Sequence, residues 1–416
     1  MNTILRLLIS VFLILTISLG TASSASNRFH SVEKSIRGVD AYAWAPTGGS
    51  VIYATSDGTL WSAQGPDFAT AIRIIKIALP EERKIEQIVW SSDGGSIAVV
   101  SPRPNDLWDT IWLVDLKTSQ HRDLLPAGAP FGGPGIRALR ISSWLPGGRI
   151  AFVQHCGTGC VGLHAVQTKD GEQYWDFCDA SGSFYWSATR ESAVAQNDAE
   201  GIGPVGLGLV SASDAVVVAN RASYYRPRRE CSSVFKGAVR CGTCGPSQVE
   251  PNFNSWFPDS KTVLYTDEGL NSSELKLWNT VSGLRTTLVA SGYSGALSPD
   301  GRYAAFIRPV HESAVTGDGK RVSLAILDLR SKKIVASREI PNVQGPVQWS
   351  PSASYLASLA RDGKLLLAKV TPAGIKLRRT EFDASDFYDQ LSWSPDGKYL
   401  AVWDKASGLK ILVSID

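Results

Sequence analysis

The chain is poor in the side chains that metal sites and many active sites require. Only five histidines occur in 416 residues, and none of them pair at metal-ligand spacing within one predicted element. The serine nucleophile motif G-x-S-x-G is missing, and the nearest string, SGYSGA at 291–296, has the wrong spacing. No segment places its apolar residues at the helical period, so we expect no helix beyond a turn or two.

A strong charge of one sign is also lacking. The 42 basic side chains stand against 39 acidic ones, which leaves a formal net charge of +3. Such a balance gives no general attraction to polyanions, so we expect no nucleic-acid binding. The apolar share of 44% excludes a disordered chain and allows one large domain or two ordinary ones.

The chain has a single long apolar run, from Leu7 to Leu19, which follows Arg6 and precedes the small residues GTASSAS. This order predicts a cleavable secretory signal over residues 1–25, with residues 26–416 as the mature protein. Thirteen residues are too few to cross a bilayer, although an uncleaved anchor remains the alternative. We therefore expect a periplasmic or secreted protein that is soluble after cleavage and monomeric.

One sequence unit recurs along the mature chain. Each copy starts with a large apolar residue, continues through a tight polar turn of the S-P-D-G type, and then enters a short apolar strand. The eight heads are Trp44, Trp90, Trp144, Trp186, Trp256, Leu297, Trp349 and Trp393, separated by 41 to 70 residues. Two further short strands follow in most copies. Four short strands at this period predict the blades of a β-propeller.

We predict an all-β fold, a single β-propeller with eight blades of four antiparallel strands. Seven blades are the alternative, because the Trp186 unit has neither Pro nor Gly in its turn. The last unit has room for only two strands after Trp393, and the segment Arg28–Ile36 has no unit of its own. We expect this segment to pair beside Leu409–Ile415 and so close the ring, which removes an exposed sheet edge.

Two residue types in the repeat invite functional interpretations that we set aside. The head tryptophans are expected to pack between blades rather than to bind sugars. The turn aspartates Asp93, Asp259, Asp300 and Asp396 occur singly, whereas a calcium loop needs several oxygen ligands at close spacing. We expect them to fix the turns by accepting backbone hydrogen bonds.

The units resemble the TolB-type, WD40-like propeller repeat. The strings WSPDGKYLAVW at 393 and LSPDGRYAAFI at 297 carry the resemblance, with WSSDGGSIAVV at 90 a weaker match. The resemblance covers most of the mature chain at the level of the repeat, and it implies a propeller that serves as a docking platform or a gate. Neither the additional α/β domain of TolB itself nor a peptidase domain accompanies the repeats, and the repeat has no catalytic residues to transfer.

All six cysteines lie within about ninety residues, at Cys156, Cys160, Cys178, Cys231, Cys241 and Cys244. In an exported chain an even number favours disulfides, although a zinc site is the alternative. Of the fifteen possible connectivities, the one that we expect pairs Cys156 with Cys160, Cys178 with Cys231 and Cys241 with Cys244. A redox role for CGTC is not expected, because no thioredoxin-like strand and helix surround it.

The long interval between Trp186 and Trp256 contains a basic, cysteine-rich segment, residues 221–250, which we expect as an insertion between blades 4 and 5. Long loops on a rigid scaffold commonly bind ligands, and arginine suits carboxylate or phosphate. Two further long loops, 308–321 and 101–110, are expected on the same face. The candidate binding residues are Arg221, Tyr224, Tyr225, Arg226, Arg228, Arg229, Lys236, Arg240, His311 and Trp108.

These residues predict a binding or scaffold protein that recognises an extracytoplasmic protein or an anionic glycan. A solvated loop without a ligand is the alternative for the basic segment. An alternative function is a hydrolase or lyase that acts on a glycan through carboxylates at the mouth of the channel. We expect no cofactor and no metal, and we assign no catalytic residue; whether the protein is an enzyme stays open, with the balance against it.

Overall fold

The computed structural model describes most of the chain after residue 33. The described residues are 34–104, 109–126, 138–155, 161–169, 173–177, 182–197, 206–213, 215–218, 236–240, 250–268, 273–309, 322–340, 343–360, 364–371, 373–383, 390–404 and 408–413. Every element in this part of the chain is a strand. Nowhere in it does a helix occur with the length and apolarity needed to cross a membrane.

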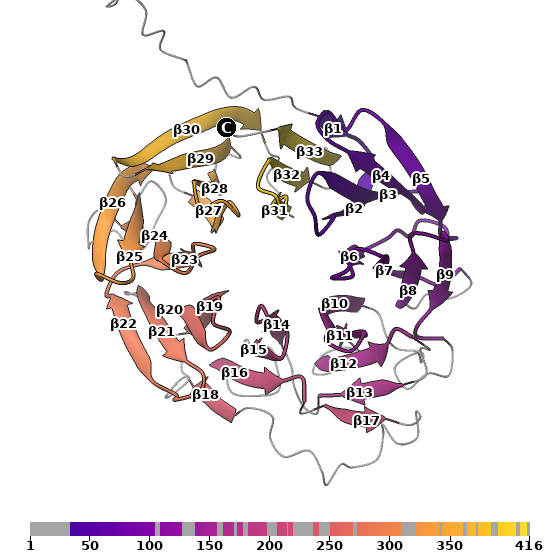
Figure 1. The fold of residues 1–416 in the computed structure, drawn as a ribbon, viewed down its shortest axis with the longest axis horizontal. Coiled ribbons are helices and arrows are strands. Elements are labelled where there is room, and N and C mark those ends of the chain that lie inside the picture. Colours follow the sequence, from indigo (N-terminus) through magenta and orange to yellow (C-terminus); the bar gives the residue numbers. More distant parts are fainter. Residues whose placement is uncertain are drawn as a thin grey trace, which may run out of the picture.

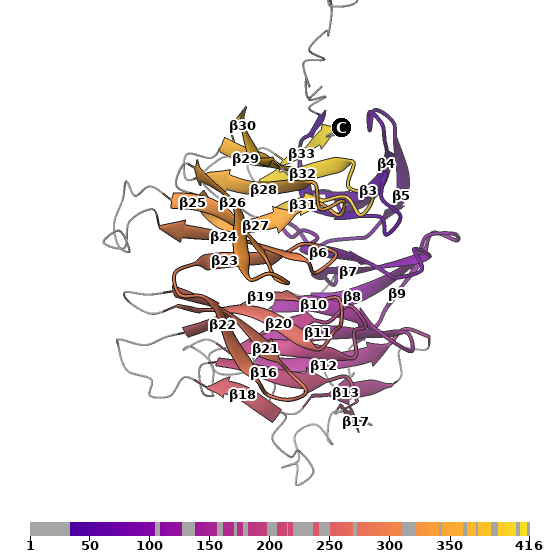
Figure 2. The same ribbon diagram turned by 60° about the vertical axis from the view of Figure 1, so that its left-hand side comes forward.

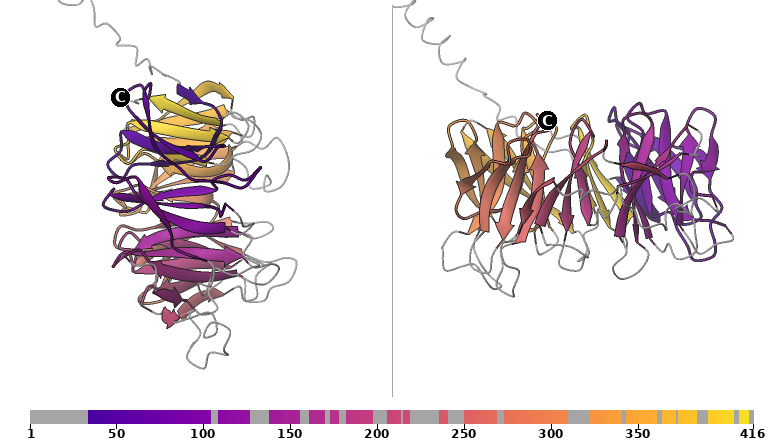
Figure 3. Two further views of the ribbon diagram at one scale, coloured as in Figure 1. Left: turned by 90° about the vertical axis from the view of Figure 1, so that its right-hand side faces the viewer. Right: turned by 90° about the horizontal axis from the view of Figure 1, so that it is seen from below.

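The strands form eight antiparallel sheets arranged in a ring, and in each sheet the strand that contains the head residue of the repeat lies nearest the centre (Figure 1). The eight-bladed prediction is confirmed, and the seven-bladed alternative is wrong because the Trp186 unit forms a sheet of its own. Seen from the side, the ring is a disc whose strands run between its two faces (Figures 2 and 3).

The blades contain the following strands, listed from the centre outwards. Blade 1 contains β2 (Val39–Trp44), β3 (Ser50–Thr55), β4 (Thr59–Gln64) and β5 (Ala71–Lys76); blade 2 contains β6 (Gln87–Trp90), β7 (Ser96–Pro102), β8 (Asp109–Asp115) and β9 (Gln120–Asp123). Blade 3 contains β10 (Ala138–Leu145), β11 (Arg149–His155), β12 (Val161–Gln167), β13 (Tyr174–Asp176) and β17 (Val216–Val218). Blade 4 contains β14 (Ser183–Trp186), β15 (Ser192–Asn197), β16 (Gly206–Ser211) and β18 (Lys236–Arg240).

The second half of the ring follows the same order. Blade 5 contains β19 (Glu250–Trp256), β20 (Thr262–Glu268), β21 (Ser273–Asn279) and β22 (Arg285–Val289); blade 6 contains β23 (Tyr293–Leu297), β24 (Tyr303–Pro309), β25 (Val322–Asp328) and β26 (Lys333–Ile340). Blade 7 contains β27 (Val343–Trp349), β28 (Tyr355–Ala360), β29 (Lys364–Thr371) and β30 (Gly374–Asp383). Blade 8 contains β31 (Gln390–Trp393), β32 (Tyr399–Asp404), β33 (Gly408–Val413) and β1 (Lys34–Ile36).

The N-terminal strand completes the last blade, as the sequence predicted. β1 pairs antiparallel with β33, with Lys34 opposite Ile411 and Ile36 opposite Leu409. The two ends of the propeller therefore share one sheet, and this sheet holds the ring closed (Figure 1).

The hydrophobic core is divided among the interfaces between blades. Each of the eight clusters of buried side chains joins two adjacent blades, and one of them joins blade 8 to blade 1 through Tyr399 and Tyr42. The second strand of a blade is buried almost along its whole length, as in β7 and β28, because each sheet packs both of its faces against its neighbours. A blade therefore cannot bury its core by itself, and the ring is the folding unit.

The head tryptophans lie at these interfaces, as predicted, and most also donate a hydrogen bond across them. Trp90 Nε1 donates to the carbonyl of Ala43 at 3.2 Å, and Trp349 Nε1 donates to the carbonyl of Ala296 at 3.1 Å. In each pair the acceptor directly precedes the head residue of the preceding blade. This repeated bond fixes the height of each inner strand relative to the next.

The turn aspartates accept hydrogen bonds within their own turns, in agreement with the prediction. Asp300 Oδ1 accepts the Ser298 hydroxyl at 2.5 Å and the backbone N–H of Arg302 at 3.1 Å. The same two bonds recur around Asp93 and Asp396. The carboxylate thus satisfies donors that the tight turn would otherwise leave unpaired.

These turns also touch one another around the ring. A Cβ atom placed on Gly301 would lie 3.0 Å from Pro258 Cδ, in the turn of the preceding blade. Gly301 has a φ of +69°, a left-handed conformation that favours glycine. The Pro and Gly of the repeat therefore shape one turn and also allow the next blade to approach.

Candidate binding surface

The two faces of the disc differ in the length of their connections. On one face, here called the turn face, the first and second strands are joined by three to five residues in every blade. On the other, the loop face, the second strand joins the third and each blade joins the next. Its longest connections are residues 124–137, 310–321 and 77–86. Length variation on one face of a rigid scaffold is typical of a binding surface.

Most of the predicted binding residues lie outside the described residues. These are Arg221, Tyr224, Tyr225, Arg226, Arg228, Arg229, His311 and Trp108, and the six cysteines lie there too. The binding role and the disulfide pairing of these residues therefore stay predictions.

Two predicted residues, Lys236 and Arg240, are the ends of β18. β18 pairs with β16 as the outer strand of blade 4, so this part of the segment 221–250 belongs to a blade rather than to a connection between blades 4 and 5. Before reaching β18, the chain adds β17 to the outer edge of blade 3, where it pairs with β13. The chain thus links two blades at their outer edges, which accounts for the long interval in the repeat.

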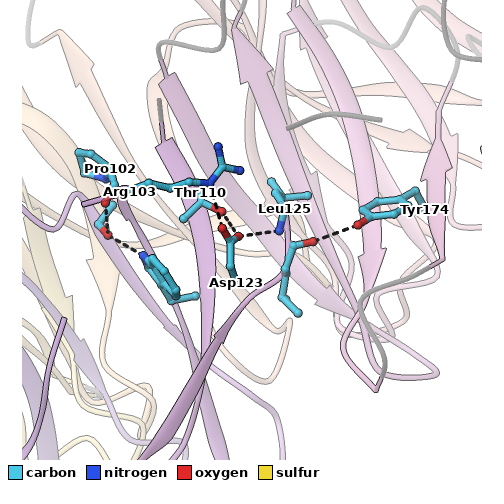
Figure 4. A network of polar contacts seen from close by, with 9 residues as sticks. Pro102, Arg103, Thr110, Asp123, Leu125 and Tyr174 are labelled. Atoms are coloured by element: carbon cyan, nitrogen blue, oxygen red, sulfur yellow. Dashed lines mark hydrogen bonds and ion pairs between the residues drawn. The ribbon is translucent and has the colours of Figure 1, made fainter. Parts of the chain in front are cut away.

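The loop face of blade 2 carries a cluster of ionic and hydroxyl side chains, here called the blade 2 cluster: Arg83, Arg103, Asp109, Thr110 and Asp123. Arg103 Nε donates to Asp123 Oδ2 at 2.9 Å, and the Thr110 hydroxyl and the Leu125 N–H both donate to Asp123 Oδ1 (Figure 4). Asp123 ends the outer strand β9, and Arg103 follows the end of β7. Their contact joins the end of β7 to the end of β9.

Asp109 is the second carboxylate of the blade 2 cluster and is almost fully buried, with 4% of its side chain exposed. Arg83 Nη2, from the connection between blades 1 and 2, donates to Asp109 Oδ1 at 3.1 Å. Burial raises the pKa of Asp109 above its ordinary value, although the charge of Arg83 and a backbone hydrogen bond with Leu139 oppose the rise. Residues from three blades thus meet at one carboxylate, directly after the predicted Trp108.

Other blades have ionic contacts on the same face. In blade 3, His164 Nδ1 lies 3.2 Å from Asp176 Oδ1, and both side chains are largely buried. In blade 5, Lys276 Nζ contacts Asp267 at 2.5 Å and Glu274 at 2.8 Å. Across the described residues, no group of three or more His, Cys, Asp or Glu side chains could hold a metal ion.

Sequence reasoning found this region only in part. It singled out the loop 101–110, which contains Arg103, Trp108 and Asp109, but it did not name Arg103 as a candidate and it missed Arg83 and Asp123. These three stand in different segments, no motif marks them, and only the folding of blade 2 brings them together.

Comparisons with known proteins support the fold at low sequence identity. No protein-family model matches the chain, and no curated protein does. The structure titled "Crystal Structure Of The C-Terminal WD40 Domain Of Sif2" matches with a TM-score of 0.55 at 15% identity, covering 94% of this chain and 100% of that chain. The "Structure of Dos1 propeller" matches with a TM-score of 0.54 at 12% identity, covering 92% and 93%.

These similarities and the eight closed blades define the chain as an eight-bladed β-propeller whose structural neighbours include WD40 domains. At such identities the similarity concerns the fold alone. The TolB-type repeat stays a resemblance, because no family model supports it.

Proposed function

We propose that the protein is an exported binding or scaffold propeller that recognises an extracytoplasmic protein or an anionic glycan through its loop face. The WD40-like fold supports a scaffold role, since such rings present loops from a rigid frame. Export rests on the predicted signal over residues 1–25. It is tested by sequencing the N terminus of the secreted protein, which should begin near residue 26; a retained Met1 would contradict it.

The observation that best supports binding is the pairing of Arg83 with the buried Asp109. A buried ion pair adds little net stability, because both charges lose their hydration. Burial raises the pKa of Asp109, which is the direction expected when a carboxylate loses its hydration. What the pair achieves is to hold the Arg83 guanidinium, whose side chain is still one-third exposed, in a fixed position on the loop face. A positioned guanidinium suits a carboxylate or a sulfate.

The proposal is tested by binding of the purified protein to poly-L-glutamate and to dextran sulfate, at low and at high salt. We expect salt-sensitive binding to one of the two, weakened several-fold by Arg83→Gln. Lys76→Gln is the matched control, because Lys76 also lies on this face in an ion pair, with Asp57 at 3.4 Å, but stands on the outer strand of blade 1. No binding of the wild type to either polyanion, or equal losses in both variants, would contradict an anion site at the blade 2 cluster.

The enzymatic alternative receives less support from the described residues. A glycosidase needs two carboxylates that face one substrate. The blade 2 cluster has two carboxylates, the buried Asp109 and the partly buried Asp123, and each is paired with its own arginine. Their arrangement holds charges in place rather than leaving a pair open to a glycan.

A further inference from the structure

The outer rim of blades 5 and 6 exposes aliphatic side chains beside basic ones. Val281 and Leu284, in the turn between β21 and β22, are 77% and 66% exposed. Ile334 and Val335, at the start of β26, are 40% and 54% exposed. We call these four residues the rim patch. They make up four of the seven large apolar side chains that are exposed in the described part of the chain.

Both halves of the rim patch belong to the turn face. Val281 and Leu284 occupy the connection between the third and fourth strands of blade 5, and β26 begins directly after the same connection in blade 6. Blades 5 and 6 are adjacent in the ring, and their outer strands β22 and β26 follow one another along its edge (Figure 1). The patch is therefore distinct from the loop face assigned to the proposed function.

The same two turns are rich in exposed basic side chains. Arg285 follows Leu284, and Arg330, Lys332 and Lys333 surround the start of β26. The acidic residue of these turns, Asp328, is buried and accepts the backbone N–H groups of Arg330 and Ser331. The rim thus presents positive charge without an exposed carboxylate in either turn.

We propose that the rim patch docks the propeller on an anionic lipid bilayer. Aliphatic side chains that project from turns, flanked by lysine and arginine, can enter the headgroup region while the basic groups contact lipid phosphates. A protein partner is the weaker choice, because the residues that dominate binding between proteins are most often Trp, Tyr and Arg, and of these types the two turns hold only arginine, whereas Val and Leu are under-represented among them. The patch contains no aromatic residue.

Other blades show that these exposed residues are not required by the turn. In blade 1, the corresponding connection places Phe68 in the core, where it is 1% exposed. In blade 2, where Asp115 accepts the same two backbone hydrogen bonds that Asn279 accepts in blade 5, Lys117 stands at the position of Val281 and Gln120 at that of Leu284. Blades 5 and 6 therefore carry a combination of side chains that the fold itself does not need.

The test is co-sedimentation of the full chain with vesicles of phosphatidylcholine alone and of phosphatidylcholine mixed with phosphatidylglycerol. We expect binding only to the mixed vesicles and a decrease with added salt. Lys332→Gln with Lys333→Gln should weaken binding by about fivefold for each charge. Val281→Ser with Leu284→Ser should weaken it at least tenfold without reducing thermal stability, because both side chains are exposed.

Ile72→Ser is the matched control, since Ile72 is 69% exposed on β5 of blade 1 but lies outside the rim patch. All variants keep residues 1–33, so any vesicle binding by that segment is common to them. The proposal would be overturned if both patch variants bound the mixed vesicles as strongly as the wild type, or if Ile72→Ser lost as much binding as they do. A third result would also overturn it: the wild type does not bind vesicles but self-associates, and the Val281→Ser, Leu284→Ser variant does not self-associate. The patch would then bind a second copy of the chain.

Discussion

Trp44 and Ser392 lie 348 positions apart in the chain and are joined by a hydrogen bond of 3.2 Å from the indole Nε1 to the serine Oγ. Ser392 also contacts the hydroxyl of Tyr42 at 2.7 Å. Most head tryptophans reach the preceding blade by such a bond, and here it joins the first blade to the last. The closed ring therefore depends on side chains of the inner strands as well as on β1 at the outer edge.

The indole bonds can be tested with two tryptophans in adjacent blades. Trp349 Nε1 donates to Ala296, whereas the buried Nε1 of Trp393 has no hydrogen-bond partner among the described residues. Replacement by Phe removes similar ring area at both positions. We expect Trp349→Phe to lower the free energy of unfolding by about 1 kcal/mol more than Trp393→Phe, measured by urea unfolding with circular dichroism. Equal losses would show that the indole bond contributes nothing.

The close approach of neighbouring turns predicts different costs for two glycines. Gly301 and Gly283 both have a positive φ, +69° and +73°, but only Gly301 faces a neighbouring blade. A Cβ on Gly283 would meet nothing within 4 Å. Gly283→Ala should cost about 1 kcal/mol from backbone strain. Gly301→Ala should cost clearly more, because Pro258 or its turn must move; the same loss in both variants would exclude contact between turns as a constraint.

The lowered pKa of a turn aspartate predicts that the protein loses stability in acid. Hydrogen bonding by the Ser298 hydroxyl holds the pKa of Asp300 below its ordinary value. A lowered pKa in the folded state means that the charged carboxylate stabilises the fold above the unfolded pKa of about 4, and that this contribution disappears as the pH falls through the folded value. Asp300→Asn should therefore melt below the wild type at neutral pH, with the gap narrowing in acid. A gap that does not change with pH would contradict this assignment.

The basic segment gives a prediction in which binding is lost and the fold is kept, with thermal stability as the measure of folding. Replacing Arg226, Arg228 and Arg229 by Ser should abolish salt-sensitive binding to the polyanion that the wild type binds, while the melting temperature stays unchanged. Arg149→Ser is the contrasting variant, because the Arg149 guanidinium lies over the Trp175 ring of blade 3, 5.2 Å from its centroid. This substitution should lower thermal stability but leave binding unchanged. Unchanged binding in the triple variant would remove the segment from the binding site.

The repeat can be predicted from the sequence because the residues that form each turn are close together in the chain. Ser298, Asp300 and Gly301 stand within four positions, and the turn that they form follows from their own backbone preferences and hydrogen bonds. Eight such turns, each followed by an apolar strand, were sufficient to predict the number of blades and the strand that closes the ring. The length of the interval after Trp186 predicts an insertion, whereas the structure pairs β17 with blade 3 and β18 with blade 4, and neither strand follows a turn of the repeat.

The sequence by itself therefore determined an all-β ring, its turns and the place where its ends meet, since each of these follows from residues close together in the chain. Only the tertiary structure decided that Arg83 faces Asp109, that Arg103 faces Asp123, and that the exposed aliphatic side chains gather on blades 5 and 6. Those contacts depend on how strands from separate segments align, and a charged or apolar residue by itself does not specify its distant neighbour.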